Sequence, residues 1–341
     1  MNIEVADVSK AFGAKSVLKN ITLDIAAGTW LSIVGSSGCG KSSLLNIVAG
    51  ILDADGGVVK IGSAASAASR RACVAYLLQD FPLYPSLTVR DNLQFAGKHQ
   101  AAPDGPSVEQ VIQELQIANL MAQFPSTLSG GERQRVALGR TLLLHRPVLL
   151  LDEPLSNVDV LSRRSIRRYL KRTTKLWQTT TVLVTHDQED AISTSDVVSV
   201  LHEGKLLQVD GPVSLFESAA TRLVADTFGD VQMSWLPARI MCADQWQQGD
   251  LDTDCAMVGI RETAFRTSLE PMPGYWQVRI VQSEFLGSRT RAFVQYQACE
   301  FTVMMNDHHS LGAGDVIWVN PDMRRAAIYR KGERVNGVVS D

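Results

Sequence analysis

Apolar and polar positions between residues 1 and 230 predict strands that alternate with helices. The segment PVLLLDEP is continuously apolar up to its acidic end, as expected of a parallel strand buried on both faces. Further strands are predicted at residues 2–9, 21–25, 30–35, 74–80, 180–187 and 197–209. A helix is predicted at residues 40–50, where Gly50 is a suitable stop, and residues 81–145 are mainly helical. This alternation favours an α/β fold.

The pattern changes to a period of two after Gly229. Apolar and polar residues alternate at residues 276–285, 290–297, 300–305, 315–321 and 326–330. Turn sequences around Gly287 and Gly312 separate some of these segments. Several short strands at near-regular spacing predict a small β-barrel or sandwich. We therefore expect an α/β domain at residues 1–230 and an all-β domain at residues 236–335.

The composition is that of an ordinary globular protein with a large core, with 45% apolar and 20% charged residues. The formal net charge of −3 gives no bulk basicity for holding nucleic acid. The first residues show no secretory pattern, and no segment approaches the ~20 apolar residues that span a bilayer. The cysteines form no Cys-x-x-Cys pair, which argues against a disulfide framework and a zinc site. A role at a membrane would therefore require a partner protein.

A glycine-rich turn between a predicted strand and a predicted helix carries the strongest chemical signal. It reads Gly35-x-x-x-x-Gly40-Lys41-Ser42, which matches the Walker A pattern completely. In such loops backbone N–H groups surround phosphates, the lysine reaches the β- and γ-oxygens, and the hydroxyl binds Mg²⁺. The predicted nucleotide-binding residues of this loop are Gly35, Ser36, Ser37, Gly38, Cys39, Gly40, Lys41, Ser42 and Ser43.

Acidic and polar side chains follow the ends of other predicted strands. Asp152 is placed to hold Mg²⁺, and Glu153 to orient or deprotonate an attacking water. Gln79 ends its predicted strand with an amide suited to Mg²⁺ and water. His186 follows another strand, where a histidine is either structural or in contact with a γ-phosphate and the attacking water. We expect catalytic roles for Glu153, His186 and Gln79, and Mg²⁺ ligands in Ser42, Gln79 and Asp152.

The segment LSGGERQR, residues 128–135, predicts a second anion site. Ser129, Gly130 and Gly131 precede an amphipathic run. Free N–H groups and the helix dipole at such a start favour negative charge. Because the chain already has one complete phosphate loop, this second site needs a separate explanation.

The phosphate loop, LSGGERQR, LLLDEP, SNVD and VTHD occur together and in this order. This set resembles the nucleotide-binding subunits of ATP-binding-cassette (ABC) transporters, which bind ATP and Mg²⁺, and the resemblance covers the α/β domain. It implies an ABC cassette with an inserted helical subdomain at about residues 82–145. It assigns Gln79 to the Q-loop, Asp159 to the D-loop and His186 to the switch position. Phe12 matches the aromatic position that stacks on adenine, where the family more often has tyrosine.

The resemblance also explains the second anion site. In this family two cassettes pair head to tail, and the signature loop of one contacts the γ-phosphate held by the other. Ser129, Gly130 and Gly131 are therefore expected to serve ATP bound to another chain, most simply a second copy of this one. Because Lys41 and Glu153 are both present, such a homodimer would have two competent ATPase sites.

A narrower resemblance concerns the importer ATPases of carbohydrate, polyamine, ferric-iron and phosphonate uptake. Residues 77–93, 184–191 and 204–212 carry it. Those proteins end in a small OB-like β domain, the TOBE domain, and VGIRETAF here resembles its GIRPE stretch but lacks the proline. The fold class implied is an α/β P-loop NTPase followed by a small all-β OB-like (TOBE) domain at residues 236–335.

This second resemblance implies the partners. Closure of two cassettes would be coupled to two transmembrane permease subunits, with an extracytoplasmic solute-binding protein acting indirectly, and no nucleic acid is expected as a partner. The chain is expected to be peripheral, at the cytoplasmic face of the inner (cell) membrane. Residues 80–89 (DFPLYPSLTV) are the expected link to the permeases. No residue pattern indicates the transported substrate.

Three alternative functions stay open on the sequence. ABC ATPases of translation or DNA repair usually have two cassettes in one chain or a long coiled-coil insertion, and neither pattern is present. An exporter motor has no need of the β-rich tail. A catalytically silent, regulatory ATP binder is disfavoured by the presence of Glu153 and His186.

A basic helix is predicted at residues 161–176, where seven Lys and Arg residues occur without an acid. Such a run is either a solvated face or a contact with anionic lipid or an acidic partner. The sequence leaves both interpretations open.

Overall fold

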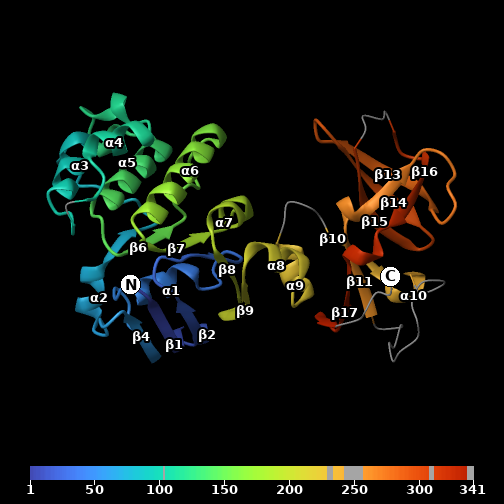
Figure 1. The fold of residues 1–341 in the computed structure, drawn as a ribbon, viewed down its shortest axis with the longest axis horizontal. Coiled ribbons are helices and arrows are strands. Elements are labelled where there is room, and N and C mark those ends of the chain that lie inside the picture. The colour runs from blue at the N-terminus through green and yellow to red at the C-terminus, as the bar shows by residue number, and fades with distance from the viewer. Residues whose placement is uncertain (103, 229–232, 242–255, 307–310, 336–341) are drawn as a thin grey trace. The chain divides into compact units, whose positions relative to one another are not determined.

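The computed structural model describes residues 1–341 except 103, 229–232, 242–255, 307–310 and 336–341. The chain forms two compact units, Met1–Pro212 and Val213–Asp341 (Figure 1). The α/β elements belong to the first unit, and the period-two strands belong to the second. Each unit has its own hydrophobic core and is described by itself below.

The second unit begins earlier than the sequence pattern predicts. The pattern places the end of the α/β domain at residue 230, whereas helices α8 (Pro212–Glu217) and α9 (Arg222–Thr227) group with the β-rich part of the chain. Arg222 N donates a hydrogen bond of 2.8 Å to Gly332 O, which ties α9 to the last strands. Helical periodicity shows that a helix buries one face but does not identify the core that receives it.

The first unit is built around a six-stranded sheet with the spatial order β5-β6-β7-β3-β8-β9. Neighbouring strands are parallel except β8 and β9, which pair antiparallel at one edge. The strands are β3 (Trp30–Val34), β5 (Val74–Leu77), β6 (Val148–Asp152), β7 (Thr180–Thr185), β8 (Val197–His202) and β9 (Lys205–Asp210). This is the parallel core that the alternating pattern predicts.

Strand β6 shows how a continuous apolar run fills both faces of the sheet. All five of its residues are buried. Leu149 and Leu151 belong to one hydrophobic core, while Val148 and Leu150 belong to the other. Successive side chains of a strand point to opposite faces, so one strand supplies both cores.

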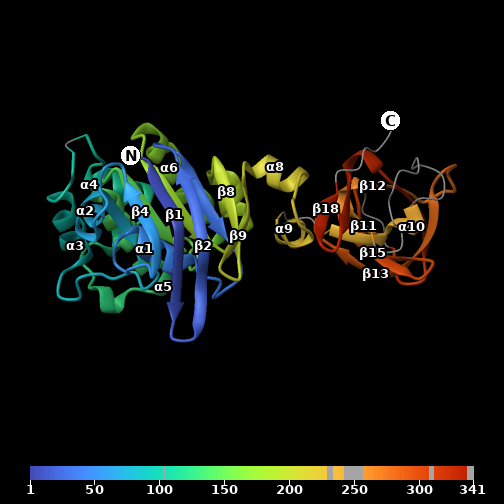
Figure 2. The same cartoon turned by 90° about the horizontal axis from the view of Figure 1, so that it is seen from below.

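Helix α1 (Lys41–Val48) packs between two sheets (Figure 2). On one side it contacts β6 and β7, and on the other it contacts β2 and β4 of a three-stranded antiparallel sheet ordered β2-β1-β4. The elements of this layer are β1 (Ile3–Phe12), β2 (Lys15–Ile25), β4 (Gly56–Ile61) and the short helix α2 (Ala67–Cys73). The helix that follows the phosphate loop is therefore held on both sides.

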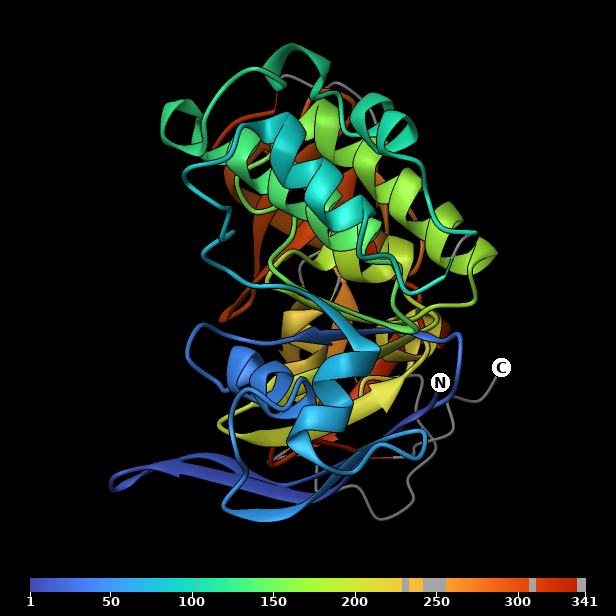
Figure 3. The same cartoon turned by 90° about the vertical axis from the view of Figure 1, so that its left-hand side faces the viewer.

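Helices cover the opposite face of the central sheet (Figure 3). They are α3 (Val89–Gly97), α4 (Val108–Glu114), α5 (Gly130–Leu143) and α6 (Val160–Leu176), with the 3₁₀ turns η1 (Ala118–Leu120) and η2 (Pro125–Thr127). Helix α7 (Gln188–Thr194) packs against α6 and against β3 and β7. Among the residues described, no helix is both long and apolar enough to cross a membrane.

The basic run of α6 is paired inside the chain. Its ion pairs among the described residues are Arg163–Asp187, Arg167–Glu189, Arg167–Asp190 and Arg172–Glu114. Burial raises the pKa of Asp190 to about 6, and the nearby Arg167 opposes that rise. The acids that the basic helix lacks are supplied by α7 and α4, which gives several of its cations a structural role.

Two antiparallel sheets enclose the core of the second unit. One has the order β10-β11-β17-β18, and the other has the order β12-β16-β13-β14-β15. The strands are β10 (Met233–Pro237), β11 (Ala256–Arg261), β12 (Phe265–Ser268), β13 (Trp276–Phe285), β14 (Thr290–Tyr296), β15 (Cys299–Met305), β16 (Val316–Pro321), β17 (Ala326–Arg330) and β18 (Glu333–Val335). The remaining elements are α10 (Ala238–Met241), η3 (Glu262–Ala264) and η4 (Met323–Arg325). The predicted period-two segments are all strands.

A buried ion pair links the turn η3 to strand β14 in this β unit. Glu262 is 0% exposed, and Arg291 donates to it from both Nε and Nη2 at 2.7 Å. Bidentate pairing of this kind matches the planar guanidinium to the carboxylate. Removing one partner from such a pair is costly because the other charge stays buried.

Replacing Glu262 by Gln is therefore expected to lower the free energy of unfolding of the second unit by about 3 kcal/mol. The amide cannot neutralise Arg291, whose other acidic neighbour, Glu284, is 3.8 Å away. Denaturant-dependent hydrogen exchange of amides in β11 and β14 measures the change. Glu300→Gln is the matched control, because Glu300 is exposed. An equal effect of the two substitutions would contradict a stabilising role for the buried pair.

Candidate functional site

The phosphate loop connects β3 to α1, and its glycines are required by close backbone approaches. A Cβ at Gly35 would lie 2.1 Å from Leu201 O. Gly40 has a φ of 111°, and a Cβ there would lie 2.9 Å from Val17 O. No other residue fits these positions without moving the backbone. The loop is therefore a tight cradle whose shape depends on strands far away in the sequence.

The cation of the loop and the start of its helix both face the cradle. Lys41 is 7% exposed, and its Nζ donates to Gly35 O at 2.8 Å and to Ser36 O at 3.0 Å. The N-cap residue of α1 is Gly40, which has no side chain to cap the first N–H groups of the helix. Uncapped N–H groups at a helix start, together with an ammonium, suit an anionic ligand.

Asp152 ends β6 beside the phosphate loop. It is 2% exposed, and its Oδ1 has no hydrogen-bond partner. Burial raises the pKa of its carboxyl group, while a hydrogen bond from Ser42 and the charge of Lys41 oppose that rise. A buried carboxylate oxygen without a partner, next to a hydroxyl, suits a hard cation.

Glu153, the residue after Asp152, contacts His186, the predicted switch histidine. Glu153 N donates to Val184 O at 2.9 Å, which continues the pairing of β6 with β7. The residue has a φ of 50°, and its Oε1 lies 3.2 Å from His186 Nδ1. His186 is 62% exposed at its side chain, against 22% for Glu153. The structure thus brings these two predicted catalytic side chains together just after the carboxyl ends of β6 and β7.

The signature segment caps helix α5. Ser129 Oγ accepts from Glu132 N, and Ser129 N and Oγ donate to Glu132 Oε2 at 2.9 and 2.7 Å. The hydroxyl bond lowers the pKa of Glu132. Gly130 is exposed, and a Cβ at Gly131 would lie 2.6 Å from Asn157 O. Reciprocal capping of this kind fixes where the helix starts.

A buried glutamine links this helix to the Glu153 loop. Gln134 is 0% exposed, its Nε2 donates to Glu153 O at 2.7 Å, and its Oε1 accepts from Asn157 N at 2.9 Å. Both interactions use the backbone of the loop and leave the carboxylate of Glu153 available. The signature helix therefore positions the loop that carries Glu153, a link that sequence reasoning missed.

Three further predicted site residues are exposed. Phe12 ends β1 and is 51% exposed, with Lys10 Nζ 5.6 Å from the centre of its ring. Gln79 is exposed and follows the end of β5 at Leu77, so it lies past its strand rather than on it. Asp159 is exposed and caps α6 by accepting from Ser162 N at 3.0 Å.

Residues outside the phosphate loop, which match no motif, also line its mouth. The cavity against the loop is lined by Lys15, Ser16, Val17, Lys19, Ser36, Ser37, Gly38, Cys39, Glu203 and Gly204. Lys19 N donates to Gly204 O at 2.8 Å, so β2 and the turn after β8 meet there. Because these segments are distant in the sequence and match no motif, only the folded chain reveals them.

Comparison with known proteins identifies the family. A family model described as ABC transporter matches residues 18–156. The sulfate/thiosulfate import ATP-binding protein CysA of Synechococcus elongatus is 33% identical over 302 residues, which span 87% of this chain and 86% of that protein. The chain belongs to the ATP-binding proteins of ABC transporters. The predicted importer-type ABC ATPase is thereby confirmed.

Two further similarities bear on this ABC ATPase. The maltose/maltodextrin import ATP-binding protein MalK of Photorhabdus laumondii is 38% identical over 244 residues, covering 70% of this chain and 66% of that protein. A solved dimeric structure of an ATP-binding cassette, in a post-hydrolysis state bound to ADP and phosphate, has a TM-score of 0.56 at 27% identity. It covers 61% of this chain and 98% of that one. The predicted cassette fold and the predicted ATP binding are confirmed.

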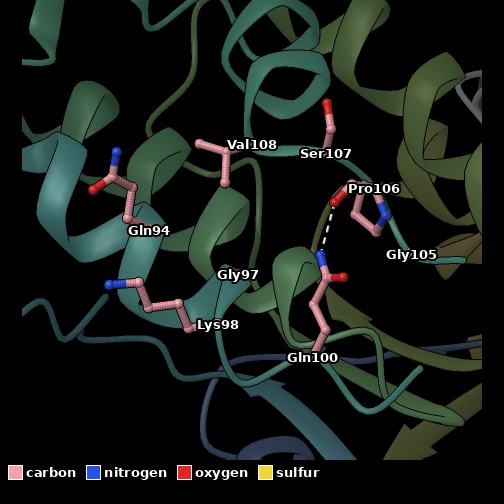
Figure 4. A pocket seen from close by; sticks show the side chains of 8 residues that line it. All are labelled: Gln94, Gly97, Lys98, Gln100, Gly105, Pro106, Ser107 and Val108. Atoms are coloured by element: carbon pink, nitrogen blue, oxygen red, sulfur yellow. Dashed lines mark hydrogen bonds between the residues drawn. The ribbon is translucent and has the colours of Figure 1, made fainter. Parts of the chain in front are cut away.

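A shallow depression in the helical layer of the ABC ATPase is separate from the site. Figure 4 shows Gln94 and Lys98 on one side and Ser107 and Val108 on the other. Gln100 Nε2 donates to Pro106 O at 2.7 Å and holds the connecting loop. None of the residues that line the depression is acidic, so we assign it no catalytic role.

Proposed function

We propose that this ABC ATPase works as one of two identical cassettes that close around ATP and reopen on hydrolysis. The chain is the ATP-hydrolysing motor subunit of a membrane importer. The observation that carries the site assignment is the arrangement around β6. Asp152 lies beside Ser42 of the phosphate loop, and the next residue, Glu153, contacts His186.

ATP and Mg²⁺ fit the residues present. The phosphate loop, from Gly35 to Ser43, would hold the triphosphate, and the exposed ring of Phe12 would stack on adenine. Mg²⁺ would be held by Ser42, Asp152 and Gln79, and the partnerless Oδ1 of Asp152 supports this assignment. When bound, the ion neutralises charge on the β- and γ-phosphates.

Hydrolysis would use the contact between Glu153 and His186. Glu153 would orient the attacking water and accept its proton. As an imidazolium, His186 would donate one hydrogen bond from Nδ1 to Glu153 Oε1, 3.2 Å away, and another from Nε2 to a γ-phosphate oxygen. Most of the acceleration would come from positioning and charge stabilisation, as in phosphoryl transfer generally.

Gly130 supports the head-to-tail dimer. A Cβ built at Gly130 meets no atom within 4 Å, and no positive φ requires glycine there. Glycine at the start of a helix lowers stability by roughly 0.5–1 kcal/mol relative to alanine, and nothing in the described residues of the chain explains it. A close approach by a ligand from outside the chain would explain it. That ligand would be ATP held by a second copy, with Ser129, Gly131 and Asp159 beside it.

The surface around residues 80–89 suits a contact with transmembrane permease subunits. Asn92 is 0% exposed and fixes this segment: its Oδ1 accepts from Tyr84 N, and its Nδ2 donates to three carbonyl oxygens. Tyr84 is 43% exposed and packs edge-on against Phe95, which is 44% exposed and lies 4.5 Å from the ring of His99. A rigid, exposed aromatic cluster is typical of a protein interface.

Replacing Phe95 by Ala is expected to weaken binding to the permease subunits by about ten-fold or more, because aromatic side chains dominate such interfaces. The measurement starts from detergent-solubilised membranes of the source cells, with the tagged chain pulled down and co-eluting membrane proteins quantified. ATPase activity of the isolated chain should stay unchanged, since Phe95 lies outside the phosphate loop and the Glu153 loop.

Leu176→Ala is the matched control for this experiment. Leu176 is another exposed apolar side chain, 78% exposed, at the end of α6. Its removal should leave co-elution intact. Recovery of ribosomes or DNA with the wild-type chain, or of no membrane protein, would overturn the proposed partners.

The importer assignment also bears on the location of the chain and on the choice of substrate. We infer a peripheral position at the cytoplasmic face of the inner (cell) membrane, with an extracytoplasmic solute-binding protein delivering the solute. The names of the similar importers mention sulfate or thiosulfate in one case and maltose or maltodextrin in the other. Substrate choice therefore belongs to the other subunits. We also propose that residues 236–335 form a TOBE domain.

A further inference from the structure

A cavity lies against the sheet β10-β11-β17-β18. Gly259 on β11 lies opposite Ala327 on β17 and opposite Trp235 on β10. The neighbouring positions on the other face, including Val258 and Ile328, point into the hydrophobic core. Gly259 and Ala327 thus lie on the face turned away from the core, where the ring of Trp235 covers Gly259, since a Cβ at Gly259 would lie 2.8 Å from that ring.

Arginine side chains line this cavity. The cavity of about 270 Å³ is lined by Phe216, Glu217, Met233, Gly259, Arg261, Arg324, Arg325, Ala326, Ala327, Tyr329 and Arg334. Four of these residues are arginines and one is an acid. All of them belong to the unit Val213–Asp341, whereas the phosphate loop belongs to the other unit. We refer to this cavity as the arginine notch.

The scaffold positions several of the guanidinium groups. The guanidinium of Arg261 lies 4.3 Å from the centre of the Phe216 ring, and its Nη2 donates to Phe216 O at 3.4 Å. Arg261 is 5% exposed. Arg334 Nη1 donates to Glu217 O at 2.9 Å, which orients it from the end of α8. Arginines held in this way lose little side-chain freedom when a ligand binds.

The side chains that line the notch include more cations than acids. Arg324 Nε lies 3.2 Å from Asp322 Oδ1, so one cation is largely neutralised. Glu217 is exposed at the rim and offsets a second. Arg325 is exposed in the same wall. Gathering cations costs electrostatic energy, which an anion within the cavity would relieve.

We propose that the arginine notch binds a tetrahedral oxyanion, either free sulfate or phosphate or the terminal phosphate of a small ester. Guanidinium groups present paired N–H donors that match the oxygens of such anions. This site is distinct from the ATP site, because it shares no residue with the phosphate loop.

Isothermal titration of sulfate, phosphate and glycerol 3-phosphate into the full chain tests the proposal. The chain carries Lys41→Ala so that binding at the phosphate loop is suppressed. One saturable site per chain is expected. Adding Arg325→Ala should weaken it by about ten-fold or more, because a charge-assisted hydrogen bond is lost. A tighter fit for glycerol 3-phosphate than for phosphate identifies an ester as the ligand, and equal binding identifies the free ion.

Two further variants separate an anion site from a general charge effect. Arg279→Ala removes an equally charged, exposed arginine of the same unit that does not line the notch, and it should leave the affinity unchanged. Glu217→Gln removes the acid at the rim and should tighten binding several-fold. No saturable binding of any of the three anions, or an equal loss with Arg279→Ala and Arg325→Ala, would overturn the proposal.

Discussion

Glu153→Gln is expected to lower the rate of ATP hydrolysis by about 10²–10⁴-fold while ATP binding persists. The amide has the shape of the carboxylate but cannot take a proton from water. The fold around it should not change, because the loop is fixed through its backbone. Glu153 N donates to Val184 O, and Glu153 O accepts from Gln134 Nε2 at 2.7 Å. With hydrolysis blocked, the ATP-bound dimer should accumulate.

Three measurements check this result on one preparation. Single-turnover hydrolysis gives the chemical rate, a fluorescent ATP analogue gives the affinity, and size-exclusion chromatography with ATP gives the dimer fraction. Glu109→Gln is the matched control, because Glu109 is an exposed glutamate on α4 of the same unit and belongs to neither the phosphate loop nor the Glu153 loop. It should hydrolyse ATP at the wild-type rate. ATP hydrolysis by Glu153→Gln at close to the wild-type rate would exclude Glu153 as the general base.

The strands were predictable because their signal is local. Successive side chains of β13 point alternately to the core and to solvent around Val278 and Ile280. A period of two is therefore visible in the sequence without knowledge of the partner strands. The phosphate loop was predictable for a related reason. Phosphate binding needs glycines, a lysine and a serine close together in one short loop, and residues Gly35 to Ser42 are contiguous in the sequence.

The rest of the site depends on contacts between distant segments, which leave no local pattern. Val17 O approaches Gly40 only because β2 packs against the phosphate loop. Gln134 is an ordinary polar residue in the sequence, yet it is buried and holds the loop of Glu153. Catalytic roles for Glu153 and His186 were expected from the sequence, but their contact at 3.2 Å depends on the register of β6 and β7.

The basic helix shows the limit of reading charge along one segment. Residues 161–176 contain no acid, so their sequence alone leaves a lipid contact open. The fold brings α7 alongside, where Glu189 and Asp190 pair with Arg167 at 2.9 and 3.0 Å. The domain boundary also depends on contacts between distant segments. Helices α8 and α9 belong to the second unit because of the residues that they pack against, which their own sequence does not reveal.

Mixing two inactive variants is expected to restore ATPase activity if the signature loop serves the ATP of another chain. Lys41→Ala removes the cation of the phosphate loop, and Gly130→Ala places a methyl group where that ATP would approach. Each variant alone should lose about a hundred-fold or more, since misplacement by an ångström has effects of this size. A mixed dimer contains one intact site, made from the phosphate loop of the Gly130→Ala chain and the signature loop of the Lys41→Ala chain.

Equal mixing should recover about a quarter of wild-type activity, because half of the dimers are mixed and each has one of two sites. The Gly130→Ala chain should also be slightly more stable than wild type, since alanine favours the helix start and meets no atom within 4 Å. Loss of activity with a gain in stability separates a ligand contact from misfolding. Two different tags, co-purified in the presence of ATP, establish that mixed dimers form. Mixed dimers as inactive as their parents would contradict the head-to-tail arrangement, because a signature loop that serves its own chain leaves no intact site in the mixture.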